Sequence, residues 1–195
     1  MAGEIITIIV AGILTNNIVL NQSIGICPFL GVSKKINSSV GMGMAVTFVL
    51  AVSAVVCFFI YHYILVPLGM EYLQTITFIL IIASLVQLLD IVLKKTSPAL
   101  YTSLGVYLAL ITTNCAVLFT ANYGITQQYD LLYTFVNAVC VGLGFTLALI
   151  LMAGIRERLE RADIPKLFRG FPIALIIAGI MSLAFTGFTG LSFGG

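Results

Sequence analysis

The chain has 195 residues, of which 61% are hydrophobic and 8% are charged, whereas an average soluble domain has about 25% charged residues. So few charged side chains cannot cover the surface of a soluble fold. Soluble, disordered and nucleic-acid-binding proteins are therefore excluded. The apolar runs are continuous and longer than the alternating strands of a membrane barrel, so we predict an all-α integral membrane protein.

Six apolar stretches are long enough to cross a bilayer core, which takes roughly 20 helical residues. The first follows an acid, Glu4, and no basic residue precedes Lys34. A cleavable signal peptide needs a basic start, so we expect this stretch to stay in the mature protein. The six predicted spans form a single membrane domain over 1–195 that leaves no room for a soluble domain. The spans are residues 5–29, 40–64, 72–93, 99–121, 131–155 and 171–191.

The basic residues are distributed unevenly over the loops between these spans. Of the nine lysines and arginines, two lie in the first loop, two in the third and five in the fifth. The second and fourth loops have none. Because basic loops stay on the cytoplasmic side, we predict a multi-pass protein of the cell membrane. Both termini would lie on the outer, periplasmic or extracellular, side.

Three pairs of similar segments follow one another in the same order in the two halves of the chain. We therefore predict two pseudo-repeats, about 1–95 and about 96–195. Because three spans is an odd number, the second repeat must cross the membrane in the opposite sense. Such inverted repeats place their functional site near the membrane midplane, on broken helices. The similar segments begin at Phe78 and Ile173 and at Gly41 and Gly142, and a third pair ends at Asn17 and Asn114.

The first and fourth spans are the corresponding elements of the two repeats, and both contain polar residues. Unpaired polar groups are costly in hydrocarbon, and glycine and proline interrupt a membrane helix only where protein or a cavity surrounds the backbone. We therefore expect both spans to be broken or re-entrant and to meet near the membrane centre. The first has Thr15, Asn16, Asn17, Asn21, Gln22 and Ser23 followed by Gly25 and Pro28, and the fourth has Thr112, Thr113 and Asn114.

The four cysteines do not have the close spacing of a zinc or ferredoxin motif. Cys57 and Cys140 lie in apolar helices, where cysteine usually acts as a small hydrophobic residue. Cys27 and Cys115 differ because each lies beside the polar part of a broken span. A shared redox or metal role for these two, or a structural role, both fit the pattern.

No motif indicates a self-contained catalytic site. The sequence has no nucleophile–base pair, phosphate-binding loop or HExxH motif. The basic run from Arg156 to Arg169 sets topology, or alternatively binds anionic lipid or an acidic partner.

Specific motifs nevertheless resemble those of the Rnf/Nqr membrane-subunit family, and within it the Rnf branch. The resemblance covers essentially the whole chain. It is carried by LTNNIVLNQSIGICPFLGVSKK, KKTSPALY, LITTNCAVL, GFTLALILMAGIRERLERADIP and SLAFTGFTGL.

The resemblance implies a membrane subunit of a redox-driven ion pump. Complexes of this family move electrons between ferredoxin, or a quinone, and NAD, and couple this to transport of Na⁺ or H⁺. Such a subunit pairs with a homologous six-span sister subunit of opposite orientation, alongside flavin and iron–sulfur subunits. The two membrane subunits share an intramembrane [2Fe–2S] cluster, to which this chain would contribute Cys27 and Cys115.

We therefore expect an electron-carrying translocase subunit that has no catalytic residues of its own. A cluster that takes four thiolates would need two from another subunit. Freed backbone amides near Pro28 would hydrogen-bond to its sulfurs. Asn17, Thr113 and Asn114 would surround the site, line an ion path or pair across the repeats. The alternatives are a stand-alone inverted-repeat transporter of ions or small solutes, and a structural assembly subunit.

Overall fold

The structure is a computed structural model that describes residues 13, 17–33, 36–69, 71–96, 110–162, 165 and 168–189. Within these ranges all regular structure is helical, which confirms the predicted all-α class. Part of the predicted first and fourth spans, at residues 5–12, 14–16 and 99–109, lies outside the described residues. The helices are α2 (Ile26–Val32), α3 (Ile36–Ile60), α4 (Val66–Leu68), α5 (Gln74–Thr96), α7 (Cys115–Thr126), α8 (Leu131–Leu159) and α9 (Phe171–Thr189).

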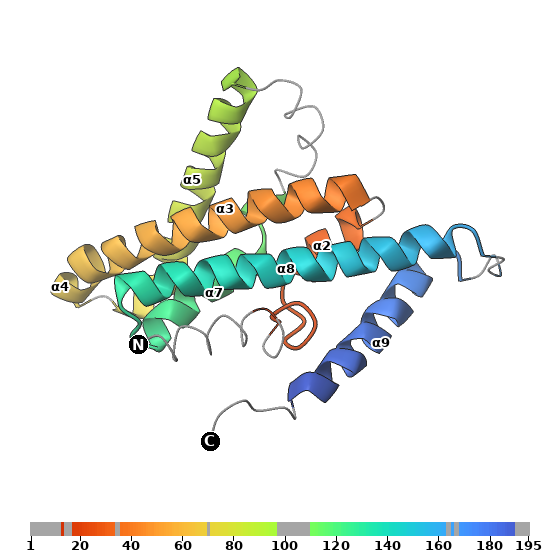
Figure 1. The fold of residues 1–195 in the computed structure, drawn as a ribbon. Coiled ribbons are helices and arrows are strands. Elements are labelled where there is room, and N and C mark those ends of the chain that lie inside the picture. The colour runs from red at the N-terminus through yellow and green to blue at the C-terminus, as the bar shows by residue number, and fades with distance from the viewer. Residues whose placement is uncertain are drawn as a thin grey trace.

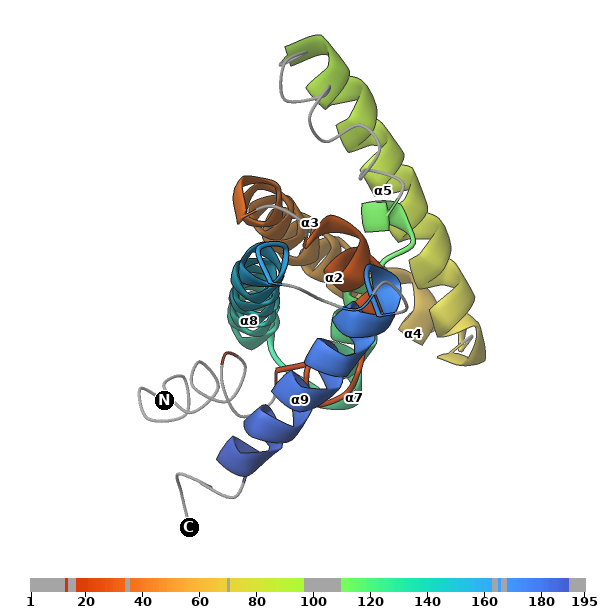
Figure 2. The same cartoon turned by 90° about the vertical axis from the view of Figure 1, so that its right-hand side faces the viewer.

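The long helices α3 and α8 form the central pair. They lie side by side and run in opposite directions (Figures 1 and 2), and their contact is the most extensive between any two described helices. Both are apolar around most of their circumference, as expected for helices that face protein on one side and lipid on the other.

Glycine and threonine residues bring α3 and α8 together by two reciprocal contacts. Gly43 of α3 packs against the side chain of Thr146, and Gly142 of α8 packs against Thr47. Each threonine hydroxyl donates to the carbonyl four residues earlier in its own helix, Gly43 O at 2.7 Å and Gly142 O at 2.8 Å. Small residues with internally satisfied hydroxyls allow close helix packing without leaving a polar group in hydrocarbon.

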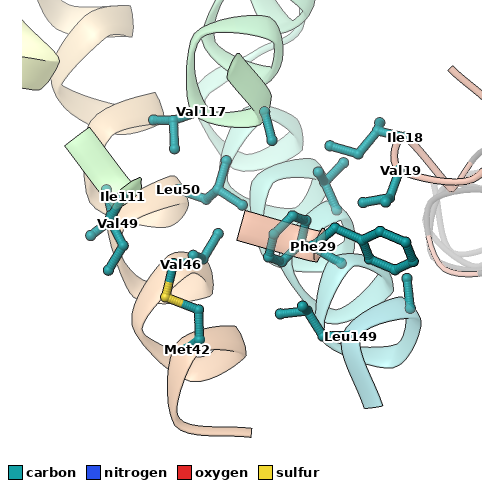
Figure 3. Packing of buried hydrophobic residues seen from close by; sticks show 14 of the residues in the cluster. Ile18, Val19, Phe29, Met42, Val46, Val49, Leu50, Ile111, Val117 and Leu149 are labelled. Carbon is teal, nitrogen blue, oxygen red and sulfur yellow. The ribbon is translucent and has the colours of Figure 1, made fainter. Parts of the chain in front are cut away.

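The hydrophobic core fills the space around this pair. Figure 3 shows Phe29 of α2 between side chains of α3, such as Leu50, and Leu149 of α8. Each of these three side chains is at most 1% exposed. Burial of Phe29 between α3 and α8 therefore holds the short helix α2 in place.

Helices α5 and α9 extend away from the central pair on opposite sides of it (Figure 1). On α5, Phe78, Ile82 and Val86 are buried at spacings that place them on one face. Ile76 and Leu80 on the other side are 64% and 66% exposed. An exposed apolar helix face is suited to lipid or to another membrane subunit.

Four helical stretches agree with predicted spans. Ile36–Leu68, Gln74–Ile91 and Leu131–Leu159 are long and apolar enough to cross a membrane, and Phe171–Gly187 is a shorter apolar helix. The total of six spans and the inverted repeat remain predictions.

Several helices extend beyond the predicted spans. The second span continues past residue 64 through a π-helical turn, Tyr61–Leu65, into α4, so Pro67 lies in the helix and not in a loop. Proline lacks an N–H, which costs little in the first turn of a new helical segment. Helix α8 likewise continues to Leu159, because arginine can extend its charged end beyond the apolar layer while its backbone stays helical.

We expect Gly142→Ala to destabilise the protein. A Cβ atom at this position would lie 2.7 Å from Thr47 Cγ2 and 2.8 Å from Thr47 Cα, and overpacking of this kind typically costs about 1–3 kcal/mol. The matched control is Gly154→Ala in the same helix, where a Cβ atom meets nothing within 4 Å. Thermal unfolding in detergent should show a lower midpoint for Gly142→Ala alone; equal midpoints would contradict the packing.

Candidate functional site

A non-helical segment, residues 17–25, precedes α2 and carries the first part of the site. Its backbone forms turns, with Asn21 N donating to Asn17 O at 2.8 Å and Ile24 N donating to Ile18 O at 3.0 Å. Ile18, Val19 and Leu20 are buried. Irregular backbone is stable at membrane depth only where protein surrounds it. Residues 17–20 meet that condition, whereas Gln22 and Ser23 are exposed.

Hydrogen bonds to α8 and α9 satisfy polar groups of this segment. Asn17 is 1% exposed; its Nδ2 donates to Gly144 O in α8 at 2.8 Å, and its Oδ1 accepts from Val19 N at 3.1 Å. Ser182 Oγ in α9 donates to Leu20 O at 2.6 Å. The segment is thus fixed to α8 and α9.

Gly25 joins the two halves of the site. Its φ of +83° lies in the left-handed region, which glycine adopts without a steric penalty. Its N–H donates to Cys115 Sγ over a donor–acceptor distance of 3.0 Å. A Cβ atom at Gly25 would lie 3.0 Å from Phe145 Cε2, so both the conformation and the space favour glycine.

The two cysteines singled out by the sequence both begin helices. Cys115 is the first residue of α7, and Cys27 is the second residue of α2, two positions after Gly25. Both are exposed, whereas Cys57 and Cys140 are buried. The structure therefore brings the backbone next to Cys27 into contact with the sulfur of Cys115 and leaves both cysteines accessible to a partner.

Asn114 caps α7 and lies beside the same contact. Its Oδ1 accepts from Ala116 N at 3.0 Å, the usual role of asparagine before the first turn of a helix. The side chain is 4% exposed, and its Nδ2 has no hydrogen-bond partner within the described residues. Thr113, the third predicted surrounding residue, is exposed.

Arg156 makes contacts with α2 that the sequence patterns did not predict. Its Nη1 donates to Leu30 O at 2.8 Å and to Ser33 Oγ at 3.0 Å, at the carboxyl end of α2. A cation there interacts favourably with the helix dipole and satisfies a terminal carbonyl. The sequence showed a basic run at the end of a predicted span, which topology, or binding of anionic lipid or an acidic partner, explained. It gave no sign of a contact with α2.

Cys27 and Cys115 are the groups of this site that could hold a metal or cluster. Among the residues that the structure describes, no three His, Cys, Asp or Glu side chains gather in one place. Exposed thiols, one of which accepts a backbone N–H, suit a thiolate-ligated centre whose other ligands come from elsewhere. The chemistry of the donor set therefore fits half of a four-thiolate site.

Comparison with known proteins identifies the family. The model of the family described as "Rnf-Nqr subunit, membrane protein" matches residues 5–192. The chain belongs to the Rnf-Nqr membrane-subunit family. The resemblance found in the sequence is thereby confirmed, and this Rnf-Nqr chain is a membrane protein.

Curated relatives align with this Rnf-Nqr protein over nearly their full length. The A-subunit of the Na⁺-translocating ferredoxin:NAD⁺ oxidoreductase complex of Acetobacterium woodii is 55% identical, over 97% of this chain and 99% of its own. The A-subunits of the ion-translocating oxidoreductase complexes of Serratia proteamaculans and Syntrophotalea carbinolica are 53% and 50% identical, over 96% of this chain and 97% of theirs.

We expect Gly25→Ala to lower the stability of the protein. A side chain in the left-handed region costs roughly 1–2 kcal/mol, and the added methyl group would press on Phe145. Gly31→Ala in α2 is the matched control, because a Cβ atom there makes only an ordinary 3.5 Å contact with Leu110. Thermal unfolding midpoints in detergent compare the two, and an unchanged midpoint for Gly25→Ala would refute the constraint.

Proposed function

We propose that this chain is the A-subunit of an Rnf-type ion-translocating ferredoxin:NAD⁺ oxidoreductase complex. In this proposal it carries electrons through the membrane, and the complex couples their flow to transport of Na⁺ or H⁺. The names of the relatives that match along nearly the whole chain support this role. The chain acts as part of a translocase, and the flavin and NAD chemistry belongs to other subunits.

The electron carrier in this proposal is a [2Fe–2S] cluster shared with a homologous sister subunit. Bound there, the cluster would accept and pass on single electrons. Cys27 and Cys115 would supply two thiolates, and the sister subunit would supply the other two. The hydrogen bond from Gly25 N–H to Cys115 Sγ is the observation that carries the proposal, because it joins the two cysteine segments.

The surrounding residues of this chain would hold the two thiolates in place. Gly25 N–H withdraws charge from the Cys115 sulfur, and such hydrogen bonds tune the potential of a cluster. The amino terminus of α7 at Cys115 favours negative charge on a bound group. Asn17 and Ser182 keep the preceding segment fixed. Asn114 Nδ2, a buried donor, would be satisfied by an acceptor in the assembled complex.

Two features of the fold support the inverted repeat within this proposal. The antiparallel helices α3 and α8 exchange equivalent contacts, from Gly43 to Thr146 and from Gly142 to Thr47. Asn17 and Asn114 each accept from the N–H two residues later. With both termini on the outer side and the basic loops in the cytoplasm, the two cysteine segments would approach each other from opposite membrane faces.

Replacement of the two ligands should remove the cluster. We expect Cys27→Ser and Cys115→Ser each to abolish the iron–sulfur EPR signal of the protein co-expressed with its sister subunit. Cys57→Ser and Cys140→Ser are the matched controls and should keep the signal, since both side chains are buried away from solvent. An intact signal in both the Cys27 and the Cys115 variants would disprove the cluster assignment.

Thiol labelling tests where the sister subunit binds. In the isolated protein, maleimide should modify the exposed Cys27 and Cys115 and spare the buried Cys57 and Cys140. In the assembled complex, Cys27 and Cys115 should be protected, because partner and cluster cover them. Peptide mass spectrometry gives the labelled fraction at each cysteine; full labelling of Cys27 and Cys115 in the complex would place the partner elsewhere.

A further inference from the structure

A cavity of about 450 Å³ lies between the carboxyl-terminal end of α8 and the first turns of α9. Its lining has a charged part and an apolar part. Arg156, Glu160 and Arg169 supply charge, and Leu159, Ile173 and Ile177 supply an apolar wall. We call this cavity the α8–α9 pocket. No cysteine is among its described lining residues, and nothing in the electron-transfer proposal uses it.

The charged part of the pocket favours an anion. Among the described residues that line the pocket, two arginines and one glutamate leave an excess of positive charge. Guanidinium groups bind phosphate through paired N–H donors. Arg156 uses Nη1 for Leu30 O and Ser33 Oγ, and a guanidinium has five N–H donors in all, so N–H groups remain for a ligand in the pocket.

The apolar part of the pocket continues along α9. Ile173 and Ile177 are four residues apart and share one helix face, which Ile180 extends by one turn. Ile180 is 62% exposed and Leu183 is 76% exposed. A hydrocarbon chain that starts at the pocket therefore has an apolar surface to follow.

The pocket also lies at the end of the apolar stretch of α8, where we expect lipid headgroups. Arg156 is the first charged residue of α8 after the apolar stretch that begins at Leu131. We therefore expect Arg156 to lie at the boundary of the membrane. A free anion would fit the arginines but would leave the apolar wall unused.

We propose that the α8–α9 pocket binds an anionic phospholipid. The headgroup phosphate pairs with Arg156 and Arg169, and one acyl chain lies along Ile173, Ile177 and Ile180. Basic pockets between membrane helices are a known form of headgroup site. Because Arg156 also holds the end of α2, the bound lipid contacts the residue that fixes the helix of Cys27.

The test measures binding of fluorescent phosphatidylglycerol to the purified complex in zwitterionic detergent. Arg169→Gln should weaken binding roughly fivefold, the effect expected for one arginine at a lipid surface. Arg161→Gln is the matched control, because Arg161 is an exposed arginine in the same connection and does not line the pocket. It should bind as the unchanged complex does.

A second variant tests the apolar wall and keeps every charge. Ile173→Phe narrows the pocket and should weaken phosphatidylglycerol binding even if Arg169→Gln fails to assemble. Unchanged binding in Arg169→Gln or in Ile173→Phe would overturn the proposal, as would an equal loss in Arg161→Gln, which would indicate diffuse surface charge. Displacement by millimolar inorganic phosphate, or equal binding of fluorescent phosphatidylcholine, would also overturn it.

Discussion

A break in a helix within an apolar protein exposes backbone N–H and C=O groups that water cannot reach. Residues 17–25 face this constraint, and their partners come from three different helices. Asn17 reaches α8, Ser182 of α9 reaches Leu20, and Gly25 reaches Cys115 at the start of α7. These hydrogen bonds join parts of the chain that are far apart in sequence, and they place one cysteine against the segment that carries the other.

One turn of α8 serves both the helix packing and the site. Gly142 and Thr146 contact α3, Gly144 O accepts from Asn17, and Phe145 lies against Gly25. Successive residues of a helix point in different directions, so a single turn can contact several elements. Any shift of α8 against α3 would thus move the supports of the cysteine segment as well. The stability of the central pair and the geometry of the site are coupled for this reason.

Different hydrogen bonds fix the two ends of α2: an N–H donates at one end and a carbonyl accepts at the other. At its amino end the left-handed conformation of Gly25 directs an N–H to sulfur, and at its carboxyl end Arg156 satisfies Leu30 O. With seven residues, α2 is too short to be stable on its own. Its position therefore depends on these end contacts and on burial of Phe29. Arg156 connects the proposed electron-transfer site to the α8–α9 pocket.

The sequence by itself determined the membrane class, the helical fold, four of the helical spans and the family, because hydropathy and local motifs are written along the chain. It predicted Cys27 and Cys115 as the site residues, and the structure leaves these two exposed and buries Cys57 and Cys140. It also indicated that Gly25 interrupts a helix, but not that its N–H meets Cys115. Only the tertiary structure decided this contact, the pairing of Gly142 with Thr47 and the second role of Arg156. Each of these contacts joins residues that are distant in sequence. Local periodicity does not indicate which distant residues come together.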